Sequence, residues 1–113
     1  IYEHIKVSPE GMASIVLTKE VLERFNATDQ LASLVVSVPG TIEGILAWSM
    51  YVEQEDGTFR VHLRSKGPTV NHIAQKFGGG GHTLACGIPS VTNSQIREVD
   101  KALEAEVSNF NKI

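Results

Sequence analysis

Hydrophobic residues recur along this 113-residue chain with two different periods. From 59 to 64, Phe, Val and Leu alternate strictly with Arg, His and Arg, which predicts a strand with one buried and one polar face. From 96 to 110, Ile, Val, Leu, Val and Phe form one stripe at helical spacing, and the charged residues between them, Asp100 included, are expected to face solvent. The chain therefore combines an amphipathic strand with an amphipathic helix.

The first 40 residues predict a hairpin followed by two helices. Residues 2–7 and 12–17 have the composition of strands, and Pro and Gly stand between them where a type I turn favours them. Thr18 is placed to cap a short helix. A second helix is expected to open near residue 28 or 29 and to end at the Pro-Gly pair at 39–40.

The order of the elements predicts the fold class. Residues 42–53 predict a long strand, and Glu-Asp-Gly at 55–57 is a hairpin signal that joins it to the strand over 59–64. Two strands, two helices, two strands and then helices predict an α+β or mixed α/β fold, with a single mixed sheet covered by helices. We expect one domain, residues 1–113, and because the chain begins with Ile we expect it to be part of a longer protein.

Charged residues are unevenly distributed along the chain. There are 10 Lys and Arg against 13 Asp and Glu, and the net charge of −3 argues against a broad, nonspecific nucleic-acid surface. Every carboxylate lies at or before Asp56 or at or after Glu98, and the segment between them holds five basic residues and three of the four histidines. An anionic ligand would meet no repelling carboxylate along this segment.

No hydrophobic run approaches the length of a membrane span and no signal peptide is visible, so we expect no membrane contact. The single cysteine, Cys86, gives no disulfide framework and fits a reducing, cytoplasmic setting. We interpret Cys86 as a small buried hydrophobic residue rather than as a nucleophile.

Four successive glycines lie inside the carboxylate-free segment, in the sequence Phe-Gly-Gly-Gly-Gly-His-Thr at 77–83. Such a run is conformationally costly, so we expect either that a ligand approaches the backbone or that the chain adopts dihedral angles that other residues resist. A helix over 68–77 is predicted to end at the run, and 82–87 is predicted to form a second helix that stops at Gly87. Glycines that feed a helix N-terminus direct free N–H groups at one point, which suits a phosphate or a carboxylate. The alternative is a tight connection between two helices, and the run fits neither the nucleoside-triphosphate loop nor the dinucleotide fingerprint.

Arg64 and His82 are the leading candidates for contact with an anion. Arg64 ends a predicted strand, where a guanidinium is held for a bidentate phosphate contact, and the alternative is an exposed surface arginine. His82 has three open roles: a phosphate hydrogen bond, stacking on a base, or capping of a helix. Ser65 either donates to the same phosphate or caps the next turn. The other histidines are interpreted as surface residues: His4, His62 and His72.

No general acid–base pair, nucleophilic triad or metal-binding carboxylate cluster emerges from the sequence. We therefore expect a domain that binds an anion without cleaving it, with no catalytic residue and no metal ligand of its own. The predicted binding residues are Arg64, Ser65, Gly78, Gly79, Gly80, Gly81, His82 and Thr83.

The succession of Arg-Ser at 64–65, Val-Asn-His-Ile-Ala at 70–74, Phe-Gly-Gly-Gly-Gly-His at 77–82 and Ala-Cys-Gly at 85–87 resembles the DHH-associated domain. This domain is the C-terminal half of the DHH phosphoesterases, and its Gly-Gly-Gly-His signature maps onto 79–82. The resemblance is sharp over 63–87 and rests on element order elsewhere. Within the family the chain is most similar to small bacterial enzymes that degrade very short RNAs and dephosphorylate 3′-phosphoadenosine 5′-phosphate. Cys86 departs mildly from relatives, which often have alanine or serine there.

The resemblance implies that this chain is the substrate-binding, C-terminal domain of a two-domain hydrolase. The other domain, N-terminal in the same chain, would hold two manganese ions, and the enzyme would act on short RNA or nucleotide substrates. A homodimer formed through that domain is a further expectation. Arg64 and the glycines would grip phosphate and sugar, and His82 would contact the nucleotide. Three alternatives stay open: part of a cyclic-dinucleotide phosphodiesterase, a noncatalytic nucleic-acid-binding module like that at the end of alanyl-tRNA synthetases, or a purely structural domain.

Overall fold

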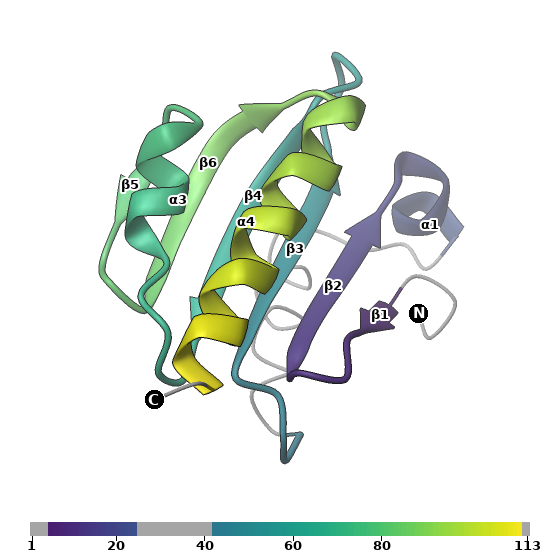
Figure 1. Cartoon of the computed structure of the whole chain (residues 1–113). Helices are drawn as coiled ribbons and strands as arrows, with labels where there is room; N and C mark the ends of the chain where they lie inside the picture. Colours follow the sequence, from purple (N-terminus) through teal and green to yellow (C-terminus); the bar gives the residue numbers. More distant parts are fainter. Residues whose placement is uncertain (1–4, 25–41, 112–113) are drawn as a thin grey trace.

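The computed structural model describes residues 5–24 and 42–111. Six strands form one sheet in the order β1-β2-β3-β4-β6-β5, in which β2 and β3 are parallel and all other neighbours are antiparallel (Figure 1). The strands are β1 (Ile5–Val7), β2 (Met12–Leu17), β3 (Ala47–Glu53), β4 (Phe59–Ser65), β5 (Gly80–Gly81) and β6 (Ala85–Val91). The helices are α1 (Lys19–Arg24), α3 (Asn71–Lys76) and α4 (Asn93–Asn111). The predicted α+β fold with a single mixed sheet is confirmed.

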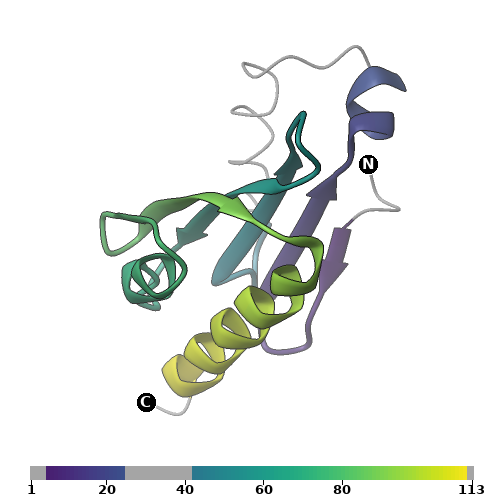
Figure 2. The same ribbon diagram turned by 90° about the horizontal axis from the view of Figure 1, so that it is seen from above.

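Helices α3 and α4 cover one face of the sheet and form the main core with it (Figures 1 and 2). Val61 and Leu63 of β4 point to this face and are fully buried, as the alternating pattern predicts. They pack in one cluster with the apolar stripe of α4, including Leu103 and Val107. Because this side of the sheet carries the core, the side chains of Arg60 and His62, which alternate with Val61, lie on the opposite face.

Three of the predicted elements are confirmed with small changes. The hairpin of β1 and β2 forms, with Ile5 opposite Ile15. The strand expected over 42–53 begins only at Ala47, because the chain turns at Gly44, where φ is 92°. The helix expected over 68–77 is α3, which is shorter at both ends. The second helix expected between residues 28 and 40 lies outside the described residues.

The prediction of a helix over 82–87 is wrong. The last two glycines of the run form β5, and the chain turns back at once into β6. His82 and Ala85 exchange backbone hydrogen bonds of 2.9 and 3.3 Å, which closes a two-residue hairpin turn. Cys86 and Ile88 are both buried in the main core, and Gly87, the predicted helix stop, lies between them within β6. The predicted anion site at a helix N-terminus is therefore not formed.

Asp100 also corrects the prediction that all charged residues of α4 face solvent. Its carboxylate accepts hydrogen bonds from Ser14 Oγ at 2.8 Å, from Ser49 Oγ at 2.7 Å and from Tyr51 Oη. These hydroxyls come from β2 and β3, so Asp100 joins α4 to the middle of the sheet. The sequence signal was present, since Asp100 lies four residues after Ile96 and three before Leu103 in the apolar stripe.

Candidate functional site

Strand pairing brings Arg64 and His82 onto one face of the sheet. Arg64 of β4 lies opposite Ala85 of β6, and Ala85 is paired in turn with His82 across the hairpin turn. Directly paired residues of antiparallel strands share a face, so Arg64, Ala85 and His82 form one row across three strand positions. Neighbouring strands lie about 4.8 Å apart, so this row is roughly 10 Å long. We call it the cationic row.

A second row runs beside the cationic row. His62 of β4 lies opposite Gly87 of β6, and Gly87 lies opposite Gly80 of β5. We call His62, Gly87 and Gly80 the glycine row. Both rows lie on the face turned away from α3 and α4, and we call this surface the arginine face.

The guanidinium of Arg64 is partly buried, and the partners it has among the described residues are neutral. Its Nη1 donates to the carbonyl oxygens of Leu63 at 2.9 Å and Cys86 at 3.1 Å. No carboxylate pairs with it within residues 5–24 and 42–111. On β3, Arg64 lies opposite Trp48, which is buried with Ala13 and Ile45. The two backbone carbonyls therefore hold the side chain, while its charge remains uncompensated within the described residues.

The charge of Arg64 is felt by its neighbours. Burial lowers the pKa of His62, and the positive charges of Arg64 and Arg60 lower it further. Burial raises the pKa of the Cys86 thiol, and Arg64 opposes that rise. Buried and with a raised pKa, Cys86 fits the predicted packing role, because a reactive thiol needs the opposite conditions.

The four positions of the glycine run differ in whether the fold itself requires glycine there. A Cβ at Gly79 would lie 2.0 Å from the carbonyl oxygen of Gly87, so β6 itself requires the close approach. Gly81 has φ of 141°, and a Cβ there would lie 2.7 Å from the Cα of Cys86. Gly78 has a positive φ as well. Gly80 is the exception, because its φ is ordinary and a Cβ there would meet nothing within 4 Å. The fold explains three of the glycines and leaves room above Gly80 for an outside group.

His82 is exposed on a rigid turn. The carbonyl of Thr83 accepts the Val70 N–H at 2.9 Å, and the carbonyl of Leu84 accepts the Ser65 N–H at 2.9 Å. The two central residues of the turn are thus tied to neighbouring segments, whereas the side chains of His82 and Thr83 are exposed. The open imidazole stays available for a ligand.

Ser65 is not brought to the arginine face. Successive strand residues point to opposite faces, so Ser65 faces away from Arg64. Its Oγ accepts the Gly67 N–H at 3.0 Å and donates weakly to the Leu46 carbonyl at 3.4 Å. These contacts are those of a turn cap, the alternative role considered for this residue.

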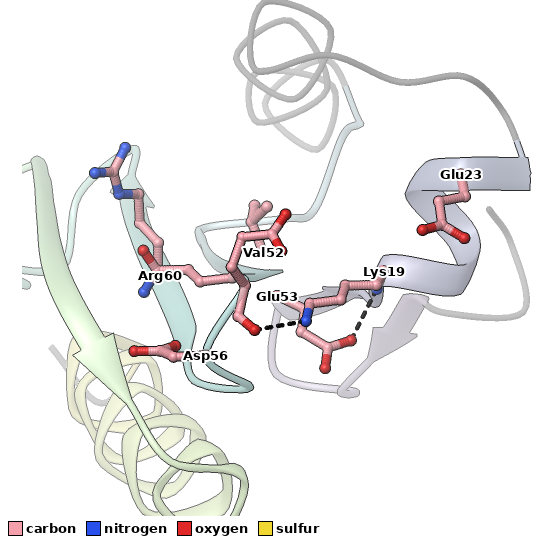
Figure 3. Close-up of a pocket in the computed structure, with 8 residues that line it drawn as sticks. Lys19, Glu23, Val52, Glu53, Asp56 and Arg60 are labelled. Atoms are coloured by element: carbon pink, nitrogen blue, oxygen red, sulfur yellow. Dashed lines mark hydrogen bonds between the residues drawn. The ribbon is translucent and has the colours of Figure 1, made fainter.

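A pocket of about 830 Å³ lies away from both rows, between α1, the end of β3 and the turn that follows it (Figure 3). Its lining includes four carboxylates, and the Lys19 backbone N–H donates to Glu53 Oε1 at 2.8 Å. The Lys19 ammonium donates to the Glu55 carbonyl oxygen at 2.7 Å. The carboxylates make this pocket a poor site for an anion.

Neither a metal cluster nor a membrane helix occurs in the described part of the chain. Among residues 5–24 and 42–111, no group of three His, Cys, Asp or Glu side chains is arranged to hold a metal ion. In the same residues no helix combines the length and the apolar character that crossing a membrane requires. The described residues therefore do not fit the manganese site that the family resemblance assigns to the other domain.

Comparison with known proteins places most of the chain in one family model. The model described as the DHHA1 domain matches residues 12–109. A protein of Bacillus subtilis (strain 168), named "Bifunctional oligoribonuclease and PAP phosphatase NrnA", is 45% identical over 87 residues, which are 77% of this chain and 28% of that protein. A protein of Streptococcus mutans, named a probable enzyme of the same kind, is 38% identical over 104 residues, 92% of this chain and 34% of that protein.

A solved structure has the same fold. The crystal structure of an exopolyphosphatase-related protein from Bacteroides fragilis matches with a TM-score of 0.76 and 26% sequence identity, and the match covers 97% of this chain and 32% of that one. This chain thus spans about a third of the length of the relatives it matches.

Proposed function

Because this chain belongs to the DHHA1 domain family, we propose that it is the substrate-binding domain of a longer DHH phosphoesterase. One observation carries the proposal: the cationic row places Arg64, without a carboxylate partner in the described chain, on the same face as the open backbone at Gly80. A cation and an accessible glycine backbone on one rigid surface suit a phosphate and the sugar attached to it.

We propose that the whole enzyme hydrolyses short oligoribonucleotides and nucleoside 3′,5′-bisphosphates. The names of the relatives from Bacillus subtilis and Streptococcus mutans support this substrate class. The hydrolytic centre, with two manganese ions, would belong to a DHH domain N-terminal to this one, and that domain is also where a homodimer would form. The single, buried cysteine fits a cytoplasmic enzyme.

Arg64 and His82 would act on the substrate as binding groups. The Arg64 guanidinium has donors beyond those engaged with Leu63 and Cys86, and it would direct them at a phosphate oxygen. His82 would hydrogen-bond the phosphate or stack on the base. Thr83 is exposed beside His82 and would be a secondary contact. Fixed donors of this kind stabilise negative charge without reorganising during the reaction.

An NMR titration tests the proposal. 3′-Phosphoadenosine 5′-phosphate and a 5′-phosphorylated dinucleotide are added to the ¹⁵N-labelled chain, and then to the two-domain enzyme. We expect backbone amide shifts at Arg64 and over 78–83, and none near Arg97, which is exposed on α4 over the other face. An Arg64→Ala variant should lose these shifts, whereas Arg97→Ala should keep them. The proposal fails if the two-domain enzyme shows no shift on the arginine face at millimolar ligand.

A further inference from the structure

His62 is placed for a role that its sequence position did not reveal. It was interpreted as a surface residue, yet the sheet puts it at one end of the glycine row, directly beside the cationic row. The side chain is half-buried, and no hydrogen bond engages its imidazole within residues 5–24 and 42–111. A histidine held on a strand with free ring nitrogens is available to a ligand.

The glycine row forms a strip without side chains next to His62. Gly87 and Gly80 are neighbours on adjacent strands, and the space above Gly80 is empty to 4 Å around the position of a Cβ. From His62 to Gly80 the glycine row spans two strand spacings, roughly 10 Å, which is about the length of a nucleoside laid flat. A nucleotide whose phosphate lies at Arg64 would therefore have its sugar and base over this strip.

We propose that His62 is a further binding residue, which holds the uncharged nucleoside part of a nucleotide whose phosphate lies on the cationic row. The proposal rests on the proposed function, since it assumes that the arginine face binds nucleotides. It extends the site from the predicted Arg64 and His82 to a third side chain. It also assigns the glycine row to a nucleoside rather than to a second phosphate.

The electrostatic setting of His62 agrees with an uncharged partner. Arg60 and Arg64 lie two residues away on either side along β4, Met50 lies opposite on β3 and Gly87 opposite on β6. Burial and the two arginines lower the pKa of His62, so the imidazole is neutral at neutral pH. A neutral imidazole has one donor and one acceptor, which match a sugar hydroxyl or a base edge.

The test uses AMP and inorganic phosphate as probes on the two-domain enzyme, with histidines ¹³C-labelled at Cε1. We expect AMP to shift the His62 signal and phosphate alone to leave it unchanged. His62→Ala should weaken AMP binding about tenfold and phosphate binding less than twofold, and His62→Gln should restore part of the AMP affinity. His72→Ala is the matched control, because His72 is exposed on α3 over the other face, paired with Glu106 at 2.8 Å.

The outcomes separate this inference from the proposed function. If AMP shifts His82 but not His62, the inference fails while the proposed function stands. If phosphate alone shifts His62 as strongly as AMP does, His62 is a phosphate contact and the assignment to the nucleoside is wrong. If AMP shifts His62 and the enzyme cleaves no phosphoester, the inference stands and the enzymatic function falls. If neither probe shifts any residue of the arginine face, both fail.

Discussion

The two faces of the sheet differ in the partners that they give to a charged side chain. Under α4, the carboxylate of Asp100 accepts hydrogen bonds from three hydroxyl groups of the same chain, two of them on the fully buried residues Ser49 and Tyr51. On the arginine face, the guanidinium of Arg64 has two backbone carbonyls as partners and no carboxylate within the described residues. The charge of Asp100 is hydrogen-bonded to groups of the same chain. The charge of Arg64 is held in position by the chain but meets no opposite charge among the described residues.

This difference separates residues that hold the domain together from residues that would bind a ligand. A buried hydroxyl group must be hydrogen-bonded within the protein, because water cannot reach it. The Asp100 network meets that need, and burial, reinforced by Asp100, raises the pKa of Tyr51 so that the phenol remains a donor. Arg64, like Asp100, is only half-buried, so its charge is tolerated without a carboxylate partner among the described residues. Substitutions under α4 should therefore mainly lower stability, and substitutions on the arginine face should mainly weaken ligand binding.

The largest expected effect is a loss of stability in Gly79→Ala, because Gly79 packs directly against the backbone of β6. The new Cβ would lie 2.0 Å from the Gly87 carbonyl oxygen and 2.8 Å from the Cα of Ile88, both backbone atoms that cannot move aside cheaply. We expect a loss of about 3 kcal/mol or more in the free energy of unfolding. Urea denaturation followed by circular dichroism measures it.

Gly80→Ala is the matched control for Gly79→Ala. Its Cβ would enter empty space at an ordinary φ, so the free energy of unfolding should change by less than about 0.5 kcal/mol. Affinity for a nucleotide should nevertheless fall, since the methyl group would occupy the strip above the backbone. Unchanged affinity in Gly80→Ala would mean that no ligand approaches this glycine.

Asp100→Ala should destabilise the domain and spare binding. Removing the carboxylate leaves the buried Ser49 hydroxyl without its acceptor and leaves the buried Tyr51 hydroxyl only the Ile96 carbonyl oxygen at 3.4 Å, which costs about 2–4 kcal/mol. Thermal unfolding measures the loss, and Glu98→Ala, an exposed change on the same helix, should be nearly neutral. If Asp100→Ala weakened nucleotide binding without lowering stability, the assignment of stability to one face and of ligand binding to the other would be wrong.

Arg64→Ala should show the reverse pattern. We expect kcat/KM of the two-domain enzyme to fall by about 1.5–3 kcal/mol of transition-state stabilisation, the scale of a lost charge-assisted hydrogen bond, with little loss of stability. Arg64→Lys should recover only part, because an ammonium cannot reproduce a bidentate contact. Arg97→Ala should leave kcat/KM unchanged, and His82→Ala should lower it without loss of bound metal. An unaltered kcat/KM in Arg64→Ala would remove Arg64 from the site.

Regular periodicity made much of the fold predictable. The strict alternation over 59–64 and the stripe over 96–110 predict β4 and α4 correctly, because each has one buried face over its full length. The family resemblance, which rests on the segment 63–87, is confirmed by the match to the DHHA1 domain. The turn of the chain before Ala47 was missed, since apolar residues at 42–46 read as a continuation of the strand.

The residue types of the candidate site were chosen from the sequence, but its geometry could not be predicted. Arg64 and the glycines were identified from chemistry, but the glycine run was expected to open a helix and instead forms an edge strand. Glycines carry no periodicity, so contacts with β6 that are distant along the chain decide their conformation. The same long-range pairing places His62 in one row with Gly87 and Gly80, and only its shared strand face with Arg64 hinted at this.

The smallest expected effect tests whether the charge of Arg64 is truly uncompensated. The pKa of His62 is lowered in the folded state, so the unfolded chain binds the proton more tightly. The contribution of His62 to stability is therefore complete above its ordinary pKa of 6.5 and is lost as the pH falls through the folded-state pKa. Between pH 7.5 and pH 5, the Tm of the wild type should therefore fall more than that of His62→Gln. Arg64→Ala should raise the pKa of His62 in an NMR titration, although burial keeps it below the usual value, and Arg97→Ala should leave it unchanged. If Arg64→Ala did not move the pKa of His62, a counter-ion would already neutralise Arg64, and the contrast between the two faces would lose its electrostatic basis.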